Sequence, residues 1–154
     1  MKRVSDEIRN RRKDYLDSRP LCEYFDACGS DFDARVWTGL EGTHRYRRQP
    51  TKPTEVHHIF GRGGPGDISE HPSNYLAVSR HYHAWATEQS VEGRIVALWW
   101  KWLHREKEPE GFDLDVLHSV FGKDLIGWVS NKLETTDLPT WVRTRGEEVL
   151  DDSN

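Results

Sequence analysis

Apolar and polar residues change their spacing several times along the chain, and each change predicts a secondary-structure element. Two β-branched residues, Val56 and Ile59, flank a pair of histidines in a short run that is typical of a β-strand. The glycine-rich stretch 61–66 predicts an irregular loop, and the apolar run 75–78 predicts a second strand. From Ser79, a candidate N-cap, the spacing becomes helical. The pattern therefore predicts strand, loop, strand and helix in that order.

Helical spacing also predicts much of the rest of the chain. A charged segment with a weak apolar stripe predicts a helix within residues 1–20, and apolar residues at helical intervals predict another over residues 90–107. Two shorter helices are predicted over residues 112–121 and 123–133. Residues 146–154 are acidic and polar and predict a frayed end. Several helices with two short strands would make a helix-rich α+β fold.

The length of 154 residues suits one domain with a single core. Within it we distinguish a charged N-terminal helix (1–20), a central unit (21–90), a helical cap (91–145) and a flexible acidic tail (146–154). The central unit carries an insertion at residues 29–53, in which two short runs around a glycine turn predict an extra β-hairpin.

Composition limits where the protein works and what it binds. Hydrophobic residues make up 35% of the chain, the mean hydropathy is −0.84, and no apolar run approaches membrane-spanning length, so no membrane association is expected. The charged N-terminus lacks the apolar core of a signal peptide, which predicts a cytoplasmic location. The net charge of −4 means that any attraction to DNA has to be local.

One local stretch is basic enough to attract a phosphate backbone. It comprises Arg45, Arg47, Arg48, Lys52 and Arg62. Alternate side chains of a strand share a face, so Arg45 and Arg47 are placed to follow a phosphate backbone together. A solvated hairpin edge protected by charge explains them equally well. Arg62 follows the histidine strand between glycines, where a guanidinium can clamp a phosphate; a loop-closing salt bridge to Asp67 or Glu70 is its alternative.

The histidine pair offers two different chemical functions. Adjacent residues of a strand point to opposite faces, so His57 and His58 can perform different tasks. A neutral histidine can take a proton from water near neutral pH. Two imidazoles alone would leave several metal positions open for water and phosphate. This arrangement suits a catalytic metal site and not a closed structural one.

Two strings in this region resemble the HNH endonucleases, the ββα-metal nucleases, and especially their phage-encoded members. Residues 57–64 contain His-His-Ile-x-Gly-Arg-Gly-Gly, and residues 74–85 contain Asn-x-Leu-Ala-Val-x-Arg-x-x-His-x-Trp. The resemblance spans residues 12–93, roughly half of the chain. It implies that the strand, loop, strand and helix form a ββα-metal core.

The resemblance implies a role for each residue at a matching position. His58 and Asn74 are the expected catalytic residues, with His58 as the general base and Asn74 as the central asparagine. Uncharged hydrogen bonds from its amide can hold either the loop-to-strand geometry or the backbone that carries His58. His57 and His83 are the expected ligands of one divalent metal ion, with magnesium or manganese favoured over nickel or zinc. His81 is two positions from His83, so the two do not share a helix face, and the alignment selects His83.

The chain departs from the family pattern at its cysteines. Relatives bind a structural zinc with two pairs of cysteines, whereas Cys22 and Cys28 are the only two here, with five residues between them. Ser79 and Tyr82 stand where the second pair is expected. A structural zinc at Cys22 and Cys28 is therefore disfavoured against two reduced thiols, and a mixed site with His81 is the alternative.

These observations give one main hypothesis and two alternatives. The main hypothesis is a metal-dependent HNH endonuclease that nicks or cuts DNA during phage or prophage DNA processing and packaging, with a terminase or another packaging protein as a candidate partner. The first alternative is a structure-specific endonuclease for branched DNA, which a homodimer would favour. The second is a non-catalytic DNA-binding or scaffold protein with a structural metal site. The intact histidine pair argues against the second, because a structural site needs no general base.

Overall fold

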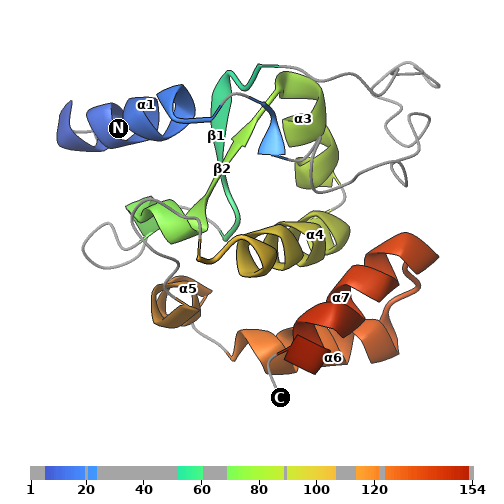
Figure 1. The fold of residues 1–154 in the computed structure, drawn as a ribbon. Coiled ribbons are helices and arrows are strands. Elements are labelled where there is room, and N and C mark those ends of the chain that lie inside the picture. Colours follow the sequence, from blue (N-terminus) through green and yellow to red (C-terminus); the bar gives the residue numbers. More distant parts are fainter. Residues whose placement is uncertain are drawn as a thin grey trace.

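The computed structural model describes residues 6–19, 21–23, 52–60, 69–88, 90–106, 114–121 and 124–152. In chain order its elements are helix α1 (Asp6–Asp17), strand β1 (Glu55–His58), the short 3-10 helix η4 (Pro72–Asn74), strand β2 (Tyr75–Val78), and helices α3 (Arg80–Glu88), α4 (Ser90–Leu103), α5 (Leu114–Phe121), α6 (Leu125–Thr135) and α7 (Thr140–Asp152). The two strands lie between α1 and α3, with α4 beneath them in the view of Figure 1. The protein is a helix-rich α+β protein, as the sequence pattern predicts.

The two strands form an antiparallel pair whose faces belong to different parts of the core. The register pairs His57 with Leu76 and His58 with Tyr75. Tyr75 packs in a small cluster with Tyr15 of α1, whereas Leu76 belongs to the larger core that α4 helps to build. Because side chains alternate between the faces of a strand, His58 is turned toward α1 and His57 toward α3.

Helix α4 lies at the centre of the larger core. Its residues Ile95 and Val96 are fully buried, and the helix packs against both α3 and α7. A Cβ atom at Gly93 would lie 3.0 Å from the Cα atom of Ala86, so the absence of a side chain lets α4 approach α3 closely. This packing holds α3, and with it His83, next to the strands.

The helices predicted from the sequence are present as α1, α3, α4, α5 and α6, with one correction at the C-terminus. The expectation of a frayed end from residue 146 is wrong for residues 146–152, which continue α7. Val142 and Val149 are buried, and residues seven apart share one face of a helix. A Cβ atom at Gly146 would lie 3.0 Å from Cδ2 of Leu133. Gly146 therefore permits close packing on α6 and does not end the helix.

Two sequence predictions concern parts of the chain outside the described ranges. The β-hairpin expected in the insertion falls there almost entirely, since only residues 52 and 53 of the insertion are described. The expected frayed end is described only as far as Asp152.

Among the helices that the structure describes, none combines the length and apolar character needed to cross a membrane.

Candidate functional site

The two histidines expected to bind a metal lie next to each other. His57 points from β1 toward α3, and His83 lies one turn into that helix. Their ring centroids are 4.9 Å apart and the ring planes are inclined by 66°, an edge-to-face arrangement. Packing of α3 against β1 holds the strand and the helix in this relation. Two neighbouring imidazoles of this kind can offer nitrogen atoms to one divalent ion.

A carboxylate completes this group of side chains. Glu55 precedes His57 by two residues, so both side chains lie on the same face of β1. Its Oε2 atom lies 2.6 Å from Nδ1 of His83. A carboxylate accepts hydrogen bonds and does not donate them, so Nδ1 of His83 carries a hydrogen, and Nε2 is the nitrogen through which the neutral ring would bind a metal. Glu55 was not among the expected site residues, although its spacing from His57 was an available signal.

Electrostatics keep His57 neutral. Burial, together with the nearby rings of His83 and His58 and the guanidinium of Arg94, lowers the pKa of His57 to about 3. The ring is therefore uncharged at neutral pH, which is the form that binds metals. Among the residues that the structure describes, no group of three or more histidine, cysteine, aspartate or glutamate side chains is arranged to hold a metal ion. Two imidazoles alone would leave the other positions of an ion open for water or phosphate.

The expected general base lies on the other face of the same strand. His58 is 8% exposed, and its Nε2 atom lies 2.8 Å from Oε2 of Glu70. Its ring meets the ring of Tyr75 edge to face, with centroids 5.4 Å apart. The structure therefore brings His57 and His83 together and directs His58 toward a second carboxylate. Alternation along the strand, which the sequence predicts for adjacent histidines, produces this separation.

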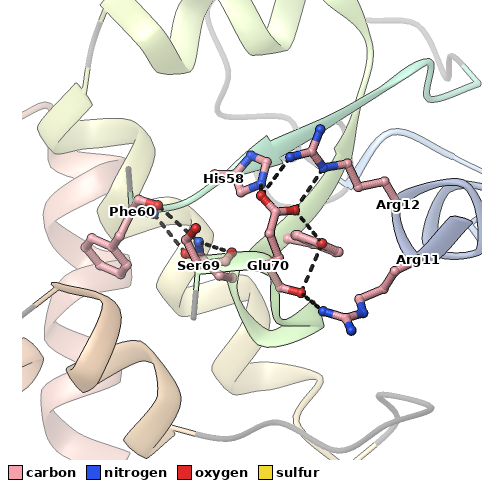
Figure 2. Close-up of polar contacts among 8 residues, drawn as sticks. Arg11, Arg12, His58, Phe60, Ser69 and Glu70 are labelled. Atoms are coloured by element: carbon pink, nitrogen blue, oxygen red, sulfur yellow. Dashed lines mark hydrogen bonds and ion pairs between the residues drawn. The ribbon is translucent and has the colours of Figure 1, made fainter. Parts of the chain in front are cut away.

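Glu70 is the centre of a buried network that joins α1 to the two strands (Figure 2). Arg12 binds the Glu70 carboxylate with two hydrogen bonds, from Nε to Oε1 at 2.8 Å and from Nη2 to Oε2 at 2.7 Å. The Tyr75 hydroxyl donates to Oε1 at 2.7 Å, and Nη1 of Arg11 donates to the backbone carbonyl of Glu70 at 2.6 Å. Burial alone would raise the pKa of Glu70, but hydrogen bonds from Arg12 and Tyr75 and the charges of His58 and Arg12 lower it to about 2.

Asn74 ties together the two ends of the segment between the strands. Its Oδ1 atom accepts a hydrogen bond from the Phe60 N–H at 2.9 Å, and its Nδ2 atom donates to the carbonyls of Phe60 at 3.0 Å and Ser69 at 2.9 Å. The amide therefore links the backbone at Phe60 to the backbone at Ser69. The side chain is fully buried, so Asn74 positions the backbone beside His58 and presents no atom to solvent.

The other expected residues are only partly described. Lys52 is exposed just before β1, whereas four basic residues lie outside the described residues, namely Arg45, Arg47, Arg48 and Arg62. Cys22 is buried, and its Sγ atom accepts a hydrogen bond from the Ser79 N–H at 3.4 Å, while Cys28 lies outside the described residues. Glu70, one of the two carboxylates considered as partners of Arg62, is bound by Arg12.

A histidine and a carboxylate are thus paired on each face of β1. His83 with Glu55 lies on the face that also carries His57, and His58 with Glu70 lies on the face toward α1.

No family model matches the sequence, and neither a curated protein nor a solved structure matches the chain.

Proposed function

We propose that this chain is a divalent-metal-dependent endonuclease of the HNH type that hydrolyses DNA phosphodiester bonds. The proximity of His57 and His83, whose ring centroids are 4.9 Å apart, carries this proposal. These are the two positions to which the resemblance assigns metal binding. They come from the first strand and the helix of a β1, β2, α3 unit, which follows the order strand, loop, strand and helix that the resemblance implies.

In this proposal His57 and His83 hold one divalent ion, and Glu55 orients the His83 ring. The bound ion would supply charge stabilisation for the phosphate and for the departing oxygen. Magnesium or manganese is the preferred ion, although imidazole ligands do not by themselves select it over nickel or zinc.

The remaining roles belong to the chain's own groups. His58 takes a proton from the attacking water, which requires that one of its ring nitrogens reaches water when DNA is bound. Asn74 holds the backbone on both sides of the loop, so it fixes the point at which the base-bearing strand ends.

DNA is the proposed substrate, and the basic residues of the insertion are proposed to contact its backbone. Lys52, the one member of this group within the described residues, is exposed at the start of the segment that leads into β1. A phage or prophage setting, a packaging partner such as a terminase, a cytoplasmic location and a homodimer on DNA belong to the same proposal. The phage setting and the packaging partner are supported by the resemblance alone, and the cytoplasmic location by the charged N-terminus.

One observation favours a second candidate, a non-catalytic DNA-binding or scaffold protein. His58 is buried and bonded to Glu70, and Arg12 binds the same carboxylate. A buried ionic network of this kind can be purely structural. In that case the metal pair would stabilise the fold and His58 would transfer no proton.

Cleavage of supercoiled plasmid DNA separates the two candidates. Wild-type protein is compared with His58→Ala and His83→Ala in magnesium, manganese, nickel, zinc and EDTA. His104→Ala is the matched control, because that imidazole follows α4 and stacks on Trp100 with centroids 4.2 Å apart, outside the proposed site. A branched DNA added as a second substrate tests the structure-specific alternative.

We expect metal-dependent nicking or linearisation by the wild type and by His104→Ala. His58→Ala should reduce the rate by about 10²–10⁴-fold, the usual contribution of general acid–base catalysis. His83→Ala should lose activity together with metal binding. Unchanged cleavage by His58→Ala would reject His58 as the general base. A wild type that cuts neither substrate with any ion would reject the nuclease and favour the scaffold candidate.

A further inference from the structure

The Glu70 carboxylate has its whole hydrogen-bonding capacity directed at fixed partners. Two carboxylate oxygens offer about four acceptor positions. Oε1 accepts from Nε of Arg12 at 2.8 Å and from the Tyr75 hydroxyl at 2.7 Å. Oε2 accepts from Nη2 of Arg12 at 2.7 Å and lies 2.8 Å from Nε2 of His58. Rotation of the carboxylate would break several of these bonds at once, so Glu70 is a fixed point for the His58 ring (Figure 2).

This arrangement decides which ring nitrogen of His58 is basic. The carboxylate oxygen only accepts, so Nε2 carries a hydrogen, and in the neutral ring the lone pair lies on Nδ1. Arg12 already balances the charge of Glu70 through a two-point ion pair.

We propose that Glu70 is the positioning residue of His58, which it holds in the Nε2–H tautomer so that Nδ1 is the nitrogen that takes the proton from water. This inference rests on the proposed nuclease function, in which His58 is the general base. It extends that function by assigning the orientation of the base to one carboxylate and by naming the atom that accepts the proton. Arg12 and Tyr75 act through Glu70, because they hold its carboxylate in place.

The chain offers a matched control for this role. Glu23 is also a buried carboxylate, and its Oε1 atom accepts a hydrogen bond from the Tyr15 hydroxyl at 2.6 Å and lies 3.6 Å from Nε of Arg19. Glu70 contacts His58, whereas Glu23 accepts its further hydrogen bond from the backbone N–H of Ala77 at 2.8 Å. Glu23→Gln therefore alters a buried carboxylate that is hydrogen-bonded to a tyrosine and ion-paired with an arginine, without touching the proposed base.

Nitrogen-15 NMR of histidine-labelled protein reads the tautomer directly. In the wild type we expect His58, assigned by the loss of its signals in His58→Ala, to be protonated at Nε2 and not at Nδ1. Glu70→Gln offers one carbonyl oxygen in place of two carboxylate oxygens, so the Nδ1–H form should become populated. Glu23→Gln should leave the His58 signals unchanged. A wild-type His58 protonated at Nδ1 would overturn the inference whether or not the protein cleaves DNA.

Steady-state plasmid cleavage gives a second measurement. We expect Glu70→Gln to lower kcat by about 10–100-fold with KM within about twofold, because orientation of the base matters in the chemical step and less in DNA binding. Glu23→Gln should retain wild-type kcat. A folded Glu70→Gln that keeps wild-type kcat overturns the inference and leaves the nuclease intact. If the wild type cleaves no DNA, the proposed function fails, and the wild-type tautomer alone decides whether Glu70 positions the ring.

Discussion

The two faces of β1 carry the same chemical pair in contrasting surroundings. On the face toward α3, the side chains of His83 and Glu55 are 27% and 38% exposed. On the face toward α1, the side chains of His58 and Glu70 are each 5% exposed, and Arg12 binds the same carboxylate. The two faces of one strand therefore carry a hydrated histidine–carboxylate pair, His83 with Glu55, and a dry pair, His58 with Glu70.

The comparison shows how solvation separates binding from positioning. A hydrated pair contributes little to stability, so its members can take a metal ion or a substrate as a new partner at small cost. A dry pair has to be fully hydrogen-bonded, because an unpaired buried charge is strongly destabilising. The α3 face is therefore suited to binding, and the α1 face is suited to holding one ring in one orientation.

The largest expected effect distinguishes the two adjacent histidines. His57→Ala removes a proposed ligand and should abolish both metal binding and cleavage. His58→Ala should bind metal normally and cleave DNA about 10²–10⁴-fold more slowly, because only proton transfer is lost. Calorimetric titration with manganese measures binding, and plasmid cleavage measures the rate. Loss of metal affinity in His58→Ala, with normal affinity in His57→Ala, would mean that the two histidines have exchanged roles.

The next effect compares the stability that each face contributes. Arg12→Gln leaves the buried Glu70 carboxylate without its two-point partner, and we expect the free energy of unfolding to fall by about 3–5 kcal/mol. Glu55→Gln changes a hydrated pair and should cost less than about 1 kcal/mol. Urea unfolding of both variants beside the wild type measures the difference. Equal losses in the two variants would contradict the contrast between a hydrated and a dry face.

Acid titration tests the dry face separately. The network of Arg12, Tyr75 and His58 lowers the pKa of Glu70 from its ordinary 4.5 to about 2. The folded state therefore gains stability that is fully present above about pH 4.5 and is lost as the pH falls toward 2, with a total of about 3 kcal/mol. Urea unfolding between pH 5 and pH 2 should show this loss in the wild type. The loss should be smaller in Glu70→Gln, and an identical pH dependence in both would remove Glu70 as its source.

Elements with a clear hydrophobic period could be predicted from the sequence. β-branched residues around the histidines predict β1, and apolar residues at helical spacing predict α4. The sequence pattern did not predict a helix over residues 146–152. A glycine and several acidic residues make the segment look polar, although Val142 and Val149 share one buried face. Leu133 of α6 lies so close to position 146 that a residue without a side chain fits there best. This requirement arises only when the two helices pack together.

The same limit applies to the site. His57, His58 and His83 belong to a local motif, so the sequence could identify them. Glu70 and Arg12 belong to no shared motif, and they meet only because α1 packs beside the strands. Their chemistry is a property of the tertiary structure, which local spacing does not reveal.

The smallest expected effect concerns the hydrated carboxylate. Glu55→Gln keeps an acceptor for Nδ1 of His83 but removes the charge that supports this ligand, so the variant should bind manganese about tenfold more weakly. Glu70→Gln is the control, because Glu70 lies on the opposite face and should leave the affinity within about twofold. Calorimetric titration of both variants measures the two dissociation constants. A carboxylate that only orients the base should not change the metal affinity. If Glu70→Gln weakens manganese binding as much as Glu55→Gln does, the two faces of β1 act as one site.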